Sequence, residues 1–152
     1  MNGRSRGELF DSVDEEGTAR LAARYAQGLL PGDLVLVVGE VGAGKSTFVR
    51  AALRELGVEG PIPSPTFTIG RTYRGRLPVA HLDLYRLEMP ESEAPDLLGE
   101  YLMPDGITFV EWPDRPLGNL FGQPSRTGRV EIDLRGNGRR EIRLELPIPG
   151  TN

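Results

Sequence analysis

The segment at residues 39–47, GEVGAGKST, constrains the fold more than any other part of the chain. It follows the unbroken apolar run at residues 34–38, which is typical of a strand buried on both faces of a parallel sheet. Apolar residues at helical spacing come next, over residues 45–56, and Gly57 is well placed to end that helix. The glycine-rich segment is therefore predicted to join a buried strand to a helix, as in α/β proteins.

The same segment satisfies the pattern G-x-x-x-x-G-K-S/T, and Lys45 is the only lysine among the 18 lysine and arginine residues. A backbone that wraps a di- or triphosphate needs conformations that glycine tolerates and larger residues do not. Lys45 offers a compact ammonium on a flexible stem, whereas the fork of an arginine is wider, and Ser46 offers a hydroxyl to Mg²⁺. The predicted nucleotide-binding residues of this segment are Glu40, Val41, Gly42, Ala43, Gly44, Lys45, Ser46 and Thr47.

Two carboxylates end apolar runs that are predicted to be strands. Asp83 follows residues 77–82 and Glu111 follows residues 107–110, so both are expected at the carboxyl edge of the sheet, where open α/β sheets bind ligands. Phosphoryl transfer needs a carboxylate that organises the metal and a group that positions the attacking oxygen. Lys45, Asp83 and Glu111 are therefore the catalytic candidates. Which carboxylate serves the metal stays open, as does the simpler role of capping a strand or pairing with an arginine.

Three further residues near these strands are candidates with competing explanations. Thr66, in the loop Ser64-Pro65-Thr66-Phe67, is expected to sense the γ-phosphate and the metal, unless this is only a loop stiffened by proline. Ser46, Thr66, Asp83 and Glu111 then make up the predicted metal site. His81 is expected to form a structural hydrogen bond rather than act as a general base. Trp112 is more typical of a core or an interface than of a nucleotide contact, although its place beside Glu111 keeps that role open.

The remaining pattern predicts a P-loop NTPase-like three-layer sandwich with a mixed central sheet flanked by helices. Ser12-x-x-Glu15 has the form of a capping box for a first helix. Strands are predicted at residues 67–73 and 77–84, and a C-terminal antiparallel hairpin around residues 136–138 is expected at a sheet edge. The chain is expected to form a single domain, residues 1–152, with flexible tails at residues 1–8 and 148–152.

Composition excludes several classes of function. The chain has no cysteine and therefore no disulfide or thiolate metal site, and no apolar run approaches the roughly 20 residues of a membrane helix. No secretory signal is visible, so a cytoplasmic location is expected. A net charge of −4 disfavours autonomous binding to nucleic acid. The arginine clusters at residues 71–76 and 135–143 are interpreted first as solvated strand ends and turns, and second as a contact patch.

The motifs GEVGAGKST, SPTF, HLDLYRL and VEW together resemble the TsaE (YjeE) family, bacterial P-loop ATPases required for N6-threonylcarbamoyladenosine (t6A) modification of tRNA. The resemblance spans residues 39–112. It implies binding of ATP or ADP with Mg²⁺, weak intrinsic hydrolysis, and action with the TsaB and TsaD proteins, through which tRNA would be met indirectly. It also implies that Lys45, Ser46, Thr66, Asp83, Glu111 and Trp112 lie at or near the site.

Two alternatives remain from the residues alone. In a P-loop small-molecule or nucleoside kinase, Asp83 would take the proton of a substrate hydroxyl and Arg86 would stabilise the moving phosphoryl group. No lid segment supports that interpretation. A nucleotide-binding regulator without meaningful turnover would differ from an ATPase only in rate. A GTPase that reads guanine through N/T-K-x-D is excluded, because that motif requires a second lysine.

Overall fold

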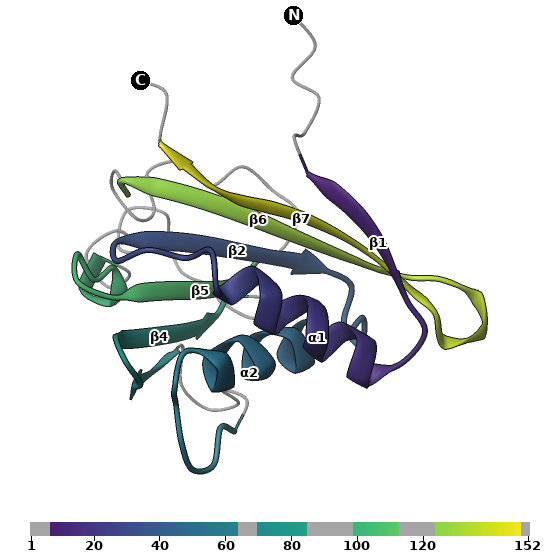
Figure 1. Cartoon of the computed structure of the whole chain (residues 1–152), viewed down its shortest axis with the longest axis horizontal. Helices are drawn as coiled ribbons and strands as arrows, with labels where there is room; N and C mark the ends of the chain where they lie inside the picture. Colours follow the sequence, from purple (N-terminus) through teal and green to yellow (C-terminus); the bar gives the residue numbers. More distant parts are fainter. Residues whose placement is uncertain (1–6, 64–69, 85–98, 113–123, 150–152) are drawn as a thin grey trace, which may run out of the picture.

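The computed structural model describes residues 7–63, 70–84, 99–112 and 124–149, and in these residues one mixed sheet of seven strands forms the centre of the molecule (Figure 1). The strand order is β1-β7-β6-β2-β5-β4-β3. The strands are β1 Glu8–Ser12, β2 Asp33–Gly39, β3 Gly70–Arg74, β4 Pro78–Asp83, β5 Ile107–Trp112, β6 Arg126–Leu134 and β7 Arg140–Pro149. The α-helices are α1 Glu15–Ala26 and α2 Lys45–Glu55, and short 3-10 turns occur at η1 Gly99–Tyr101 and η2 Gly136–Gly138.

The centre of the sheet is parallel. β2 pairs in parallel with both β5 and β6, and β5 pairs in parallel with β4. The carboxyl ends of β2, β4 and β5 consequently lie at one edge of the sheet. The register places Glu111 of β5 opposite Val37 on one side and Asp83 on the other. The strand pairing therefore brings the two predicted carboxylates next to each other, close to the loop that follows β2.

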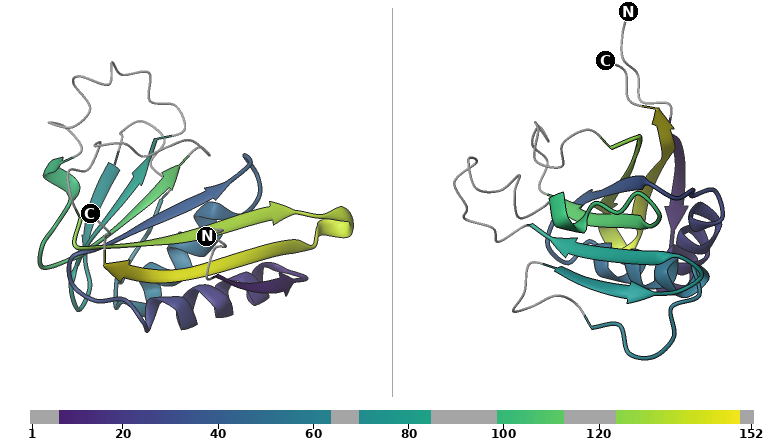
Figure 2. Two further views of the ribbon diagram at one scale, coloured as in Figure 1. Left: turned by 90° about the horizontal axis from the view of Figure 1, so that it is seen from above. Right: turned by 90° about the vertical axis from the view of Figure 1, so that its left-hand side faces the viewer.

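β2 is buried on both faces, as its apolar run predicts. The larger core lies between the sheet and both α-helices, which pack side by side on the same face (Figure 2). A smaller apolar cluster lies on the opposite face of the sheet and consists of Leu34, Leu36, Val38, Leu82, Leu84 and Val110. Tyr101, in η1, and Leu102, just after it, pack against this cluster. The described part of the chain therefore places both of its α-helices on one side of the sheet.

The start of α1 differs from the sequence prediction. α1 is capped by Asp14, whose Oδ1 accepts a hydrogen bond from the Gly17 amide at 2.7 Å. The predicted capping box at Ser12 is therefore wrong. Ser12 belongs to β1, and its hydroxyl lies 2.8 Å from the Asp14 carbonyl and 2.9 Å from the Thr18 hydroxyl. Ser12 is the last residue of β1 and therefore does not cap the helix.

The end of α2 confirms the prediction for Gly57. This glycine has a φ of 91°, in the left-handed region. Its amide donates to the Arg54 carbonyl at 3.0 Å, and the Val58 amide donates to the Leu53 carbonyl at 3.1 Å. This pair of bonds is the Schellman arrangement, which satisfies carbonyls that the end of a helix would otherwise leave exposed.

Two predictions, for the C-terminal hairpin and for the tails, need correction. β1 pairs antiparallel with β7, so the C-terminal hairpin of β6 and β7 lies inside the sheet and not at its edge. Glu8 belongs to β1, and Ile148 and Pro149 belong to β7, so these three residues are parts of strands and not of the predicted tails. Of the strand predicted at residues 67–73, residues 70–73 belong to β3, and residues 67–69 lie outside the described residues. No helix in the described ranges is long and apolar enough to cross a membrane.

Candidate functional site

The loop between β2 and α2 has the backbone that the glycine pattern predicts. Gly42 and Gly44 have φ values of 83° and 107°, which side-chain-bearing residues rarely adopt. A Cβ on Gly39 would lie 2.5 Å from the Ile132 carbonyl oxygen of β6, so only glycine fits there. Gly44 is the N-cap of α2, and within the described residues no side chain caps that end. The first amides of α2, with the positive end of the helix dipole, are therefore suited to an anion.

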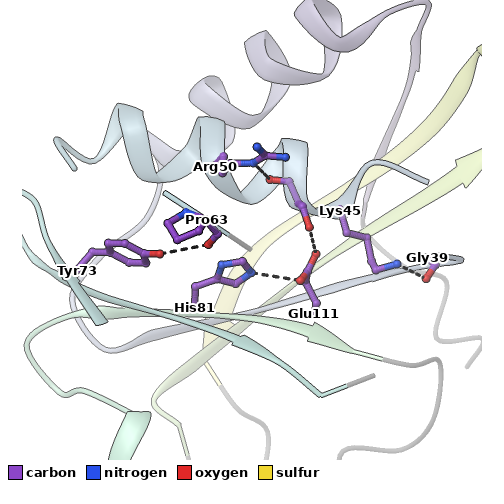
Figure 3. Close-up of polar contacts among 8 residues, drawn as sticks. Gly39, Lys45, Arg50, Pro63, Tyr73, His81 and Glu111 are labelled. Atoms are coloured by element: carbon purple, nitrogen blue, oxygen red, sulfur yellow. Dashed lines mark hydrogen bonds and ion pairs between the residues drawn. The ribbon is translucent and has the colours of Figure 1, made fainter. Parts of the chain in front are cut away.

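Lys45 folds back over this loop. Its ammonium donates a hydrogen bond to the Gly39 carbonyl oxygen at 2.8 Å (Figure 3). It donates a second one to the Glu40 carbonyl oxygen, also at 2.8 Å. Only 7% of the residue is exposed. Burial lowers the pKa of Lys45, while the charges of Glu111 and Asp83 act in the opposite direction. The carboxylates thus favour the charged ammonium at a place where burial disfavours it.

Glu111 links the loop to the sheet. The Ser46 hydroxyl donates to Glu111 Oε1 at 3.0 Å, and His81 Nε2 lies 3.3 Å from Glu111 Oε2 (Figure 3). Glu111 is 3% exposed and His81 is 1% exposed. The hydrogen bond expected for His81 is thus made with Glu111, and it holds the carboxylate oxygen that Ser46 does not contact. Asp83 lies next to Glu111 in the sheet register.

The structure therefore brings Lys45, Ser46, Asp83 and Glu111 to one place. Around them Ala43 is buried, Ser46 and Thr47 are half-buried, and Glu40, Val41 and Gly42 are exposed at the tip of the loop. Trp112 is the last residue of β5. Thr66, and Arg86 of the kinase alternative, lie outside the described residues.

One contact at the loop was missed by the sequence reasoning. Arg140, the first residue of β7, donates from its Nε to the Ala43 carbonyl at 2.7 Å. The two residues are 97 positions apart, and no spacing in the sequence relates them. Only the strand order, which places β6 beside β2 and β7 beside β6, could have pointed to this arginine.

The residues at the loop fit a nucleotide bound with Mg²⁺. No group of three or more histidine, aspartate or glutamate side chains in the described ranges could hold a metal ion by itself. Mg²⁺, however, takes oxygen ligands and commonly uses one or two protein groups together with substrate phosphates and water. The Ser46 hydroxyl and the Glu111 carboxylate, 3.0 Å apart, are such oxygen ligands, and in the glycine loop beside them a Cβ on Gly42 would meet nothing within 4 Å.

Known proteins similar to this chain agree on one family. Curated relatives named tRNA threonylcarbamoyladenosine biosynthesis protein TsaE include those of Synechocystis, Bacillus subtilis and Treponema pallidum. The Synechocystis protein is 42% identical over 117 residues, covering 70% of this chain and 70% of the relative. The Bacillus subtilis protein is 37% identical over 135 residues (86% and 80%), and the Treponema pallidum protein is 33% identical over 131 residues (86% and 95%).

The crystal structure of Bacillus subtilis YdiB is similar to the whole described fold. It matches with a TM-score of 0.70 and 28% sequence identity, over 98% of this chain and 90% of that chain. The α/β, P-loop NTPase-like fold predicted from the sequence is thereby confirmed. The family described as threonylcarbamoyl adenosine biosynthesis protein TsaE matches residues 12–142, from the end of β1 into β7. The chain belongs to the TsaE family.

Proposed function

We propose that this chain is the ATP-binding and ATP-hydrolysing component of t6A biosynthesis, dependent on Mg²⁺ and slow when isolated. It acts in the cytoplasm with TsaB and TsaD and meets tRNA only through that complex. One observation carries the nucleotide part of the proposal: the glycine loop, the buried Lys45 ammonium and the hydrogen-bonded pair of Ser46 and Glu111 adjoin one another at the carboxyl edge of the sheet. The family supports the place in t6A biosynthesis.

Each group at the loop has a role that follows from its chemistry. The first amides of α2 and the helix dipole bind the phosphate chain. Lys45 stabilises the β- and γ-phosphates as a point charge. To reach them, it exchanges its hydrogen bonds with the Gly39 and Glu40 carbonyls for hydrogen bonds with phosphate oxygens. Because these carbonyls hold the ammonium in advance, little side-chain freedom is lost on binding.

Ser46 and Glu111 hold the metal side of the site. Bound Mg²⁺ neutralises charge on the phosphate oxygens during transfer. The Ser46 hydroxyl would be an oxygen ligand of Mg²⁺, and the Glu111 carboxylate would orient a water molecule beside it. Asp83, beside Glu111 on β4, supplies the second carboxylate. His81 acts only through Glu111, whose orientation it stabilises.

Calorimetric titration with Mg-ADP and Mg-ATP tests the nucleotide site. The wild-type protein is expected to bind both nucleotides, and Lys45→Ala is expected to weaken binding by at least about 100-fold, since two or more charge-assisted hydrogen bonds are lost. A matched control is Arg50→Ala, because Arg50 is exposed on α2 and bonds only to a carbonyl of its own helix, that of Ser46, among the contacts described. Unchanged binding by Lys45→Ala would reject the site.

A reconstituted tRNA-modification assay tests the role in the pathway. Formation of t6A by TsaB and TsaD is expected to require this chain together with ATP, and Lys45→Ala is expected not to substitute for it. A pulldown with TsaB and TsaD in ATP, ADP and nucleotide-free buffer is expected to show binding that depends on the nucleotide. The proposal fails for this pathway if t6A forms equally well without the chain.

A further inference from the structure

Arg140 makes contacts at the phosphate loop that none of the roles above uses. Its Nε donates to the Ala43 carbonyl at 2.7 Å, and its Nη1 lies 3.5 Å from the Gly138 carbonyl of η2. The side chain is half-buried. It therefore connects the turn of the β6–β7 hairpin to a loop that lies nearly one hundred residues earlier in the chain.

The bond to Ala43 constrains the next amide group. All peptide bonds described are trans, and in a planar trans peptide the C=O of one residue and the N–H of the next point in opposite directions. Because the Ala43 carbonyl points to Arg140, the Gly44 amide points away from Arg140. The orientation of one N–H group of the phosphate loop is thus determined by a side chain on β7.

The loop does not fix this orientation by itself. Gly44 has a φ of 107°, and glycine accepts positive and negative φ almost equally, so the peptide between Ala43 and Gly44 can rotate at little cost when nothing holds its carbonyl. No side chain in the described residues caps α2 at Gly44. An external hydrogen bond is consequently the contact that selects one orientation.

Packing supports the hydrogen bond. A Cβ built on Gly44 would lie 2.9 Å from Arg140 Nε, 3.4 Å from Cδ and 3.6 Å from Cζ. The guanidinium end of Arg140 therefore lies directly against the Gly44 backbone. Arg140 contacts both residues of this peptide, one through a hydrogen bond and the other through van der Waals packing.

We propose that Arg140 is a positioning residue that fixes the peptide between Ala43 and Gly44, so that the Gly44 amide is presented to a bound phosphate group. The identity of the ligand as a nucleotide rests on the function proposed above. The hairpin turn that carries Arg140 thereby takes part in forming the phosphate site, although it lies far from the loop in sequence.

Three substitutions separate the hydrogen bond from the charge. Arg140→Gln places an amide N–H₂ at the position of Nε and keeps the donor without the charge. Arg140→Lys keeps the charge but places a methylene at that position. Arg140→Ala removes both. Arg139→Ala is the matched control, because Arg139 is exposed and its nearest carboxylate, on Asp11, is 4.0 Å away.

Two measurements are made on these variants. In titrations with Mg-ADP, Arg140→Lys and Arg140→Ala are expected to bind about tenfold more weakly than wild type, and Arg140→Gln within about threefold. These changes correspond to loss or retention of one partly buried hydrogen bond. In ¹⁵N relaxation dispersion of the nucleotide-free protein, the Gly44 amide is expected to show microsecond-to-millisecond exchange in Arg140→Lys and Arg140→Ala only. Arg139→Ala is expected to match wild type in both.

The two proposals fail in different ways. Wild-type affinity in Arg140→Lys, or a loss in Arg140→Gln equal to that in Arg140→Ala, overturns the positioning role while the nucleotide site stands. If wild type binds no nucleotide, the proposed function fails, and the dispersion of the Gly44 amide still decides whether Arg140 orders this peptide. If the Gly44 amide of Arg140→Ala shows no microsecond-to-millisecond exchange, that result alone overturns the inference.

Discussion

Glu111→Gln tests the chemistry of the site without disturbing its shape. The Glu111 carboxylate accepts a hydrogen bond from Ser46 at 3.0 Å and lies 3.3 Å from His81 Nε2, while only 3% of the residue is exposed. A glutamine of nearly equal volume can accept from Ser46 through its oxygen, and its amide nitrogen can donate to His81 Nε2 when the imidazole proton lies on Nδ1. Both contacts are then kept, and we expect the melting temperature to change by less than about 2 °C.

The expected loss is confined to the step that uses the negative charge. Removing one group that stabilises charge in a transition state typically costs 10²- to 10³-fold, so we expect ATP hydrolysis to fall by about 100-fold or more. Affinity for ADP in the absence of Mg²⁺ should stay within about threefold, because Lys45 and the loop amides are unchanged. The affinity for Mg-ADP should fall further than the affinity for ADP alone.

Glu111→Ala provides the comparison. It leaves Ser46 and buried His81 without their shared partner and removes packed atoms, which we expect to cost about 3 kcal/mol. For a chain of this size that corresponds to a melting temperature about 6 to 12 °C lower. Phosphate release and differential scanning calorimetry on both variants make the test. Hydrolysis at the wild-type rate by Glu111→Gln would refute the role of the carboxylate, whatever its stability.

Three other substitutions give independent expectations. Lys45→Arg should bind Mg-ADP about as poorly as Lys45→Ala, because the wider guanidinium does not fit where 7% of the lysine is exposed; titration of both variants decides this. Burial raises the pKa of Asp33 above its ordinary 3.8, so the folded state holds this proton to higher pH than the unfolded state. The free energy of unfolding of wild type, relative to that of Asp33→Asn, should therefore fall as the pH rises from about 3.8. Urea unfolding between pH 3.5 and 7 checks the sign, and a rise would contradict it. Gly57→Ala should cost about 1 to 2 kcal/mol in the same unfolding assay, since alanine must adopt a φ of 91°, whereas no loss would show that α2 can end otherwise.

The parts of the fold that the sequence predicts correctly are those with local signals. β2 is predicted by an unbroken apolar run, and the end of α2 by a glycine at the right position. The loop between them is predicted by its glycines, because each backbone constraint there restricts the residue type directly. For the same reason the sequence correctly predicts that a helix begins at Lys45 and Ser46.

The errors concern pairings between distant segments. β1 has no strong pattern of its own and exists because β7 offers it a partner, which also explains why Ser12 is a strand residue and Asp14 caps α1. The sequence placed Asp83 and Glu111 at one edge of the sheet, but only the strand order shows that they are neighbours. That Arg140 reaches Ala43 depends on a pairing across most of the chain, so no local rule could predict it.

The pairing of β1 with β7 has a consequence for the order in which the molecule assembles during synthesis. Residues 8–12 pair with residues 140–144, so β1 leaves the ribosome long before the strand that pairs with it. The segment from β2 through α2 is local and can form long before. A nascent chain that already contains the whole glycine loop therefore still lacks both β7 and Arg140, and full nucleotide affinity should develop only after β7 has been synthesised.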